Sequence, residues 1–183
     1  MERTPHTPSP RNSTEQLPKV QVQSHNLQYA RLLMDDYAGP DGELTAILTY
    51  NYQNTCLLQQ YPNVARQLER VAIEEMHHLH ALGTVIHQLG ADPRYRASHN
   101  RTTGGYYTAE VLSYNTSVPQ FLHMNMRAEQ VAIYHYQRHM QAISDPAIRQ
   151  LLHAIIAQEQ QHIALFASLL QSYTQGGWKT EKA

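Results

Sequence analysis

The chain has 183 residues and a mass of 21.0 kDa, a size that fits one domain with its own hydrophobic core. Its formal net charge is −1, so no basic excess favours nucleic acid as a partner and no acidic excess favours a solvating tail. Cys56 is the only cysteine, which excludes a disulfide framework and a Cys-x-x-Cys metal site. No stretch approaches the ~20 apolar residues of a membrane span, and no signal peptide is recognisable. We therefore expect a cytoplasmic protein with no membrane partner.

The amino-terminal region has the composition of a mobile tail. Residues 1–24 are rich in proline, serine, threonine and asparagine, which bury too little apolar surface to offset the entropy of the chain. Within this region the alternating segment Lys19–Val22 is predicted to lie extended against the body of the protein. A short helix is predicted over Leu27–Tyr37, and Gly39 followed by proline ends it.

Four long helices follow, joined by two short connections and one long one. The short connections around Pro62 and Pro146 predict two antiparallel hairpins, whereas the connection 91–118 is long enough to cross the bundle and contains at most a short helix around 108–114. Two hairpins joined by a long crossover are typical of an all-α, ferritin-like four-helix bundle, here over residues 25–173, with a loose tail over 174–183. The predicted helices are 41–60, 62–89, 119–143 and 146–173. Their predicted boundary residues are Asp41 and Asp145 as N-caps, Pro62 and Pro119 in first turns, and Gly90 at a C-cap.

The second and fourth long helices each carry a Glu-x-x-His motif, Glu75 with His78 and Glu159 with His162. Residues three apart lie on one face of a helix, so each pair can bind one metal ion. Dinuclear carboxylate bundles combine two such pairs with one glutamate from each remaining helix. In this chain the remaining glutamates are Glu43 and Glu129.

The spacing of the four glutamates predicts that they lie at one level of the bundle. In an antiparallel hairpin, residues equidistant from the turn are at the same height along the axis. Midway between Glu129 and Glu159 lies Ser144, directly before the second turn, and midway between Glu43 and Glu75 lies Gln59, directly before the first.

All four glutamates also fall on apolar helix faces. Glu75, for example, shares its face with Val71 and Leu79, and Glu159 shares its face with Ile156 and Ile163. A buried carboxylate is costly unless it is paired or bound to a metal ion, and two divalent cations are the simplest compensation. The predicted ligands are Glu43, Glu75, His78, Glu129, Glu159 and His162.

Other polar residues near the motifs receive a different interpretation. Glu74 shares its face with Gln67 and Arg70, so we expect it to face solvent together with His77. Tyr50 and Tyr136 each lie seven residues after the single glutamate of their helix; hydrogen bonding to ligand carboxylates, electron transfer and plain core packing are all open for them. The remaining histidines considered are interpreted as surface or hydrogen-bonded core residues: His80, His87, His123, His135, His139 and His153.

Several segments resemble the ferritin-like superfamily, in the short bacterial branch related to manganese catalases, rubrerythrins and bacterioferritins. The resemblance covers about residues 19–170, and the six predicted ligands are its specific part. The segments that carry it are Tyr37-Ala-Gly, Glu43-Leu-Thr-Ala-Ile, Glu75-Met-His-His-Leu, Leu89-Gly-Ala-Asp-Pro, Tyr114-Asn, and Ala128-Glu129 with Tyr134 and Tyr136.

The resemblance implies a carboxylate-bridged pair of iron or manganese ions in a homo-oligomer. It makes Glu75 and Glu159 the bridging ligands and His78 and His162 terminal ligands. The chain has no cysteine pairs for a rubredoxin-type iron site, which excludes a complete rubrerythrin with its own electron relay.

The function predicted from the sequence is redox chemistry on hydrogen peroxide or dioxygen at this dinuclear centre. Catalase, peroxidase and ferroxidase reactions all fit, and the same ligands suit iron and manganese. An iron-storage cage and a purely structural bundle are the alternatives.

Overall fold

The computed structural model describes residues 16–97 and 105–178, and these residues form an all-α fold, as expected. The described part contains no strand, only an isolated antiparallel bridge between Arg96 and Tyr106. No helix in it is both long and apolar enough to cross a membrane. The elements in chain order are α1 (Leu27–Ala38), α2 (Glu43–Leu57), α3 (Pro62–Gln88), the 3-10 turn η1 (Ala109–Val111), α4 (Val118–Ala142) and α5 (Pro146–Thr174).

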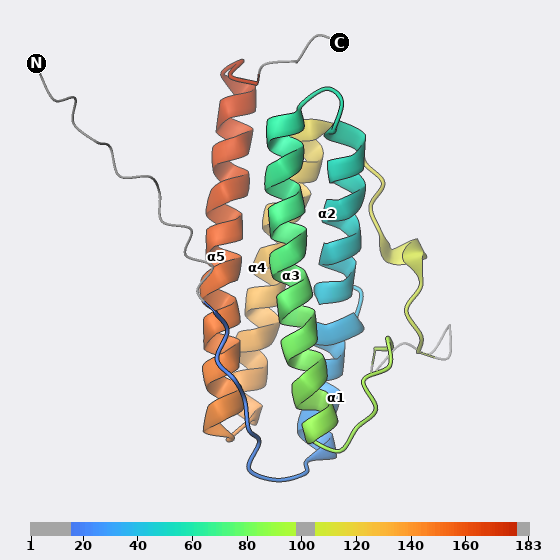
Figure 1. The fold of residues 1–183 in the computed structure, drawn as a ribbon, viewed down its shortest axis with the longest axis vertical. Helices are drawn as coiled ribbons and strands as arrows, with labels where there is room; N and C mark the ends of the chain where they lie inside the picture. Colours follow the sequence, from blue (N-terminus) through green and yellow to red (C-terminus); the bar gives the residue numbers. More distant parts are fainter. Residues whose placement is uncertain (1–15, 98–104, 179–183) are drawn as a thin grey trace, which may run out of the picture.

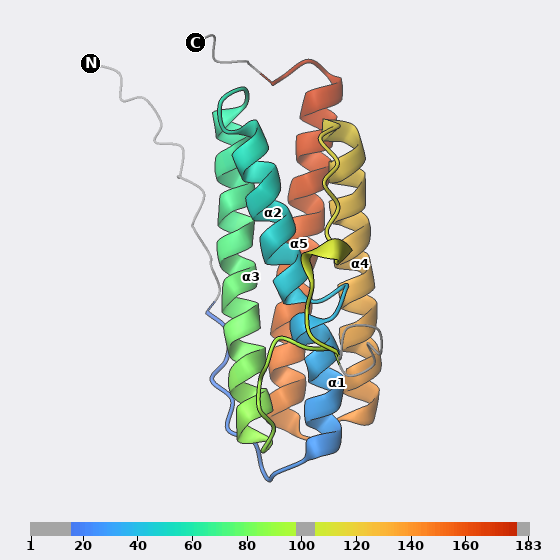
Figure 2. The same ribbon diagram turned by 90° about the vertical axis from the view of Figure 1, so that its right-hand side faces the viewer.

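The four long helices form two antiparallel hairpins, with α2 packed along α3 and α4 packed along α5 (Figure 1). Residues 105–117, the later described part of the connection between α3 and α4, run along the outside of the bundle past α2 and α4 and include η1 (Figure 2). The short helix α1 contacts α2, α3 and α4 at one end of the bundle and so joins the two hairpins. This connectivity confirms the predicted ferritin-like arrangement.

The predicted helix boundaries are right at the prolines and wrong at the start of α2. Asp145 caps α5 by accepting hydrogen bonds from two backbone N–H groups, and Pro146 occupies the first turn. Asp41 is not the N-cap of α2. Gly42 takes that position, because the chain there passes so close to the end of α1 that a Cβ atom would lie 2.5 Å from the Asp36 carbonyl oxygen. The C-cap of α3 is Leu89 and not Gly90 as predicted; Gly90 follows it with a φ of +91°.

The apolar core falls into two clusters, one toward each end of the bundle. One contains Leu33, Leu82 and Ile155, and the other contains Leu68 and Phe166. Each long helix except α2 contributes to both clusters, and a layer of buried charged residues lies between them.

Both chain ends of the described region pack against the helices. The Val22 N–H donates to Gln88 Oε1 at 3.1 Å and Gln88 Nε2 donates to the Val20 carbonyl at 3.1 Å, so the segment Lys19–Val22 lies extended along α3. The body of the protein therefore begins before residue 24, while residues 1–15 lie outside the described residues.

The carboxyl-terminal segment is also packed as far as residue 178, contrary to the expectation of a loose tail over 174–183. The Trp178 ring lies edge-on against Tyr61 and Tyr173, and its Nε1 donates to the Leu169 carbonyl at 3.2 Å. Burying three aromatic rings against one another offsets the entropy of ordering this segment. Residues 179–183 lie outside the described residues.

Candidate metal centre

The six predicted ligand side chains meet in the layer between the two apolar clusters. Glu43 lies in the first turn of α2, whereas the other five lie in the middle of their helices. None is more than 4% exposed. They form two overlapping groups, in each of which one ligand atom per residue lies within 4.8 Å of the others. The groups are Glu43, Glu75, His78 and Glu159, and Glu75, Glu129, Glu159 and His162.

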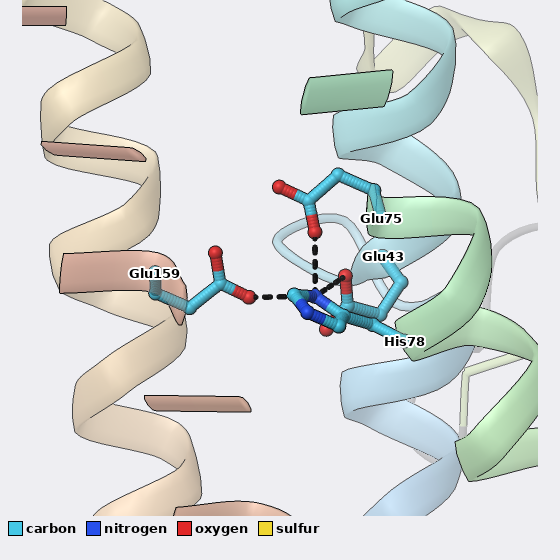
Figure 3. Close-up of side chains that lie close together, drawn as sticks. All are labelled: Glu43, Glu75, His78 and Glu159. Atoms are coloured by element: carbon cyan, nitrogen blue, oxygen red, sulfur yellow. Dashed lines mark hydrogen bonds and ion pairs between the residues drawn. The ribbon is translucent and has the colours of Figure 1, made fainter. Parts of the chain in front are cut away.

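The first group surrounds the Nδ1 atom of His78 (Figure 3). The Glu75 Oε2 atom lies 2.8 Å from this nitrogen and the Glu159 Oε1 atom lies 3.0 Å from it. Glu43 Oε2, from α2, completes the group at 3.5 Å. Three helices thus bring three carboxylates to one imidazole nitrogen.

The second group repeats this arrangement around the Nδ1 atom of His162. Glu159 Oε2 lies at 2.9 Å and Glu75 Oε1 at 3.0 Å, with Glu129 Oε1 at 3.7 Å. Glu75 and Glu159 therefore each direct one oxygen toward His78 and the other toward His162. This is the arrangement that a bridging carboxylate requires, whereas Glu43 and Glu129 each belong to one group only.

The donor set fits two divalent cations. One imidazole N–H cannot satisfy three carboxylates, and Glu75 Oε1, although 3.0 Å from His162 Nδ1, forms no hydrogen bond because that nitrogen bonds Glu159 Oε2. A buried carboxylate oxygen without a partner is costly unless a cation binds it. Carboxylate and imidazole ligands suit iron and manganese among the first-row metals.

Electrostatics in the centre favour positive charge. Burial, and then repulsion by Glu75, raises the pKa of Glu43, and burial with repulsion by Glu159 does the same for Glu129. Burial alone would lower the pKa of His78, but Glu159 and Glu43 raise it well above its usual value. His162 shows the same balance, with Glu75 as the main cause of its raised pKa. Burial opposes ionisation of Glu75, yet the two imidazoliums, first that of His162, lower its pKa.

Two buried tyrosines cross-link α2 and α4 at the centre. The Tyr50 hydroxyl donates to Glu129 Oε1 at 2.5 Å, and the Tyr136 hydroxyl donates to Glu43 Oε1. Burial, and then the negative charge of the partner glutamate, raises the pKa of both tyrosines well above the usual value. Each tyrosine therefore keeps its hydroxyl proton and donates it in a hydrogen bond. The acceptors, Glu129 for Tyr50 and Glu43 for Tyr136, are the two glutamates that belong to only one group each.

Glu74 does not face solvent as the sequence indicated. Its Oε2 accepts a hydrogen bond from His162 Nε2 at 2.9 Å, and its side chain is 24% exposed. Gln158, on α5, plays the corresponding part for His78, because its Oε1 lies 2.7 Å from His78 Nε2. These contacts cross between α3 and α5, so periodicity along one helix could not find them. The available signal was that an acceptor directly precedes the glutamate of both Glu-x-x-His motifs.

Among the residues that the structure describes, the other histidines lie outside both groups. His77, like His80, is exposed. His139 is a hydrogen-bonded core residue, with its Nδ1 2.6 Å from Asp36 Oδ2. Burial raises the pKa of Asp36 despite this contact.

The chain is similar to known proteins in sequence and in fold. The chain is 25% identical over 176 residues to a probable manganese catalase from Clostridium acetobutylicum, an alignment that covers 87% of this chain and 77% of that protein. KatB, a manganese catalase from Anabaena, has a similar structure, with a TM-score of 0.78, 25% identity, and coverage of 87% of this chain and 78% of that one.

Bacterioferritins share the fold at lower identity. The bacterioferritin of Desulfovibrio desulfuricans, described with a diiron site, aligns with a TM-score of 0.68 and 22% identity over 81% of each chain. The family model described as rubrerythrin matches residues 39–170, which include all six predicted ligands. The chain therefore belongs to the rubrerythrin family, within the ferritin-like fold.

Proposed function

We propose that the six side chains hold two iron or two manganese ions and that the protein is an oxidoreductase acting on hydrogen peroxide or dioxygen. The observation that carries this proposal is the placement of Glu75 and Glu159, each with one oxygen toward His78 and one toward His162. Two groups that share two carboxylates hold a pair of ions, whereas isolated ligand sets would hold single ions. Glu43 and Glu129 each complete one half of the centre.

A pair of iron or manganese ions held by these residues would supply two-electron redox chemistry on an O–O bond, which is the chemistry that catalase, peroxidase and ferroxidase reactions share. Neighbouring residues of the chain hold the ligand side chains in position by hydrogen bonds. Tyr50 and Tyr136 fix the carboxylates of Glu129 and Glu43 by hydrogen bonds. Glu74 and Gln158 accept from the outer ring nitrogens of the histidines and so leave both Nδ1 atoms directed at the ligand carboxylates.

The similarity to manganese catalases over most of the chain supports peroxide as the substrate. The test is elemental analysis of protein purified from its own host, followed by an assay for oxygen evolved from peroxide. Two metal ions per chain with peroxide consumption are the expected result. Protein that binds no iron or manganese under metal-replete conditions would overturn the proposal.

Substitution of the two shared glutamates tests whether these residues bind the metal ions. Glu75→Ala and Glu159→Ala should lose metal while helical circular dichroism is retained. The matched controls are Glu69→Ala on α3 and Gln160→Ala on α5, both at exposed positions, and both should keep wild-type metal content. Unchanged stoichiometry in the two glutamate variants would refute the assignment.

An iron-storage cage differs from the proposed oxidoreductase in the size of the assembly and in the number of ions it retains. A cage of many subunits would elute far above a dimer or hexamer and would retain hundreds of ions per particle. We propose a homo-oligomer that holds only its dinuclear centres, so the expected metal content stays near two ions per chain after iron loading. Accumulation of iron far beyond that ratio would favour storage instead.

A further inference from the structure

A cavity of 260 Å³ lies between α2 and α4 and reaches the ligand carboxylates Glu43, Glu129 and Glu159. Val111 and Ser113, from the crossover, line it on the outside, where the crossover runs past the two helices (Figure 2). A second hollow, lined by the amino-terminal segment 16–20, by α3 with Glu74, and by Gln158 of α5, touches none of the six ligands. Of these two cavities, the α2–α4 cavity is the one that gives a small molecule access to the ligand carboxylates.

The size of this cavity exceeds what hydrogen peroxide needs. A water molecule takes about 30 Å³ of liquid volume, and an apolar cavity of about 150 Å³ holds a benzene molecule. A volume of 260 Å³ therefore has room for a small organic group beside the reacting oxygens. Known ligand pockets begin at about 300 Å³, so the occupant is a small molecule and not a large cofactor.

The lining fits a neutral molecule with an apolar body, because Asp41 and Arg127, its two charged side chains outside the ligand set, carry opposite charges. Ala46, Phe121 and Ala128 give apolar surface. The buried amides of Gln53 and Asn125 hydrogen-bond each other reciprocally at 2.9 and 2.7 Å, so this part of the wall is polar but uncharged. Once two divalent ions are bound, four carboxylates balance their charge. The centre then gives no net attraction for a charged substrate.

We propose that the cavity takes the organic part of a small neutral hydroperoxide, R–O–O–H, and that the protein reduces it to the alcohol. This inference rests on the proposed function, because the two electrons come from two divalent ions, each oxidised by one electron. The O–O bond breaks, two protons are taken up from the medium, and R–OH and water are the products. Repeated turnover needs an external electron donor, so the test uses a single turnover.

The first test measures binding without chemistry. Cumyl alcohol keeps the organic part of cumene hydroperoxide but has no O–O bond, so it can be titrated into the full-length protein as purified and followed by ligand-observed NMR. Ala46→Phe and Ala128→Phe place a benzyl group in the cavity and should weaken binding at least about tenfold. Ala157→Phe, the same change at an exposed position of α5, should leave binding unchanged. Absence of binding to the wild-type protein, or equal binding to all variants, would overturn the inference.

The second test compares the two peroxides. Reduced, metal-loaded protein is mixed anaerobically with one equivalent of cumene hydroperoxide or of hydrogen peroxide. We expect cumyl alcohol as the product, and a ratio of organic to hydrogen peroxide rates that falls at least about tenfold in both cavity variants but not in Ala157→Phe. Reaction with hydrogen peroxide alone, or an unchanged ratio, refutes the organic substrate and leaves the proposed function standing. Reaction with neither peroxide refutes both.

Discussion

Metal binding at this centre should release protons, and the structure sets their number. Neighbouring carboxylates raise the pKa values of His78 and His162, so both imidazoles carry two protons at pH 7 before metal binds. Burial raises the pKa values of Glu43 and Glu129 from 4.5, so these carboxyls begin to hold protons at higher pH than usual. Glu75 contributes none, because its pKa is lowered. Each ligand must lose its proton before it binds a cation.

The expected release is therefore at least about two protons per dinuclear centre at pH 7, one from each histidine, and it rises toward about four wherever the raised pKa values of Glu43 and Glu129 keep these carboxyls protonated. The direction in which metal affinity changes with pH follows from this proton release. Protons compete with metal below these pKa values, so affinity falls as the pH falls, by about a hundredfold per pH unit for each pair of protons displaced.

Calorimetric titration of metal-free protein with Mn²⁺ measures this number. The binding heat is compared in buffers of different ionisation enthalpy, and the slope gives the protons released. Glu75→Ala, which lacks one of the two carboxylates that belong to both groups, should show little binding heat. Fewer than about one proton released at pH 7, with full metal occupancy in the wild-type protein, would contradict the assigned charge state of the histidines.

Three further predictions concern contacts around the centre and the core. Glu74→Gln should weaken metal binding about tenfold to a hundredfold, while His77→Gln, an exposed neighbour, should not; equal affinities would exclude an orienting role for Glu74. Tyr50→Phe leaves the buried Glu129 carboxylate without its donor and should lower the free energy of unfolding by about 1–3 kcal/mol in urea titrations, whereas Tyr52→Phe on the same helix should have little effect. Leu82→Ala, at a fully buried position, should cost about 2–5 kcal/mol, against less than about 1 kcal/mol for the half-exposed Leu58→Ala.

The sequence predicted which six side chains meet in the bundle because its signals are local or symmetric. Periodicity places Glu75 and His78 on one face of a helix, and the antiparallel hairpin brings glutamates at equal distance from the turn to one level. Both arguments need only helix geometry and the position of the turns. The prolines at Pro62 and Pro146 mark those turns clearly, because proline is tolerated in the first turn of a helix.

The contacts that the sequence missed depend on how the helices face each other. Glu74 lies at the edge between the solvent face and the core face of α3, and only the approach of α5 brings it to His162. The Gln53–Asn125 pair similarly joins α2 to α4, which belong to different hairpins. The start of α2 at Gly42 depends on the closeness of α1, which no local capping rule includes.

The charged layer explains why the two hairpins meet as they do. It divides the apolar core in two, which costs hydrophobic contact in the middle of the bundle. Two hydrogen bonds in this layer join α2 to α4, which belong to different hairpins. They run from Tyr136 to Glu43 and from Tyr50 to Glu129. The same layer leaves the α2–α4 cavity beside the carboxylates, where a continuous apolar core would have filled it. Glu43, Tyr50 and Glu129, which belong to these polar links, therefore also line the cavity in which we propose that a substrate binds.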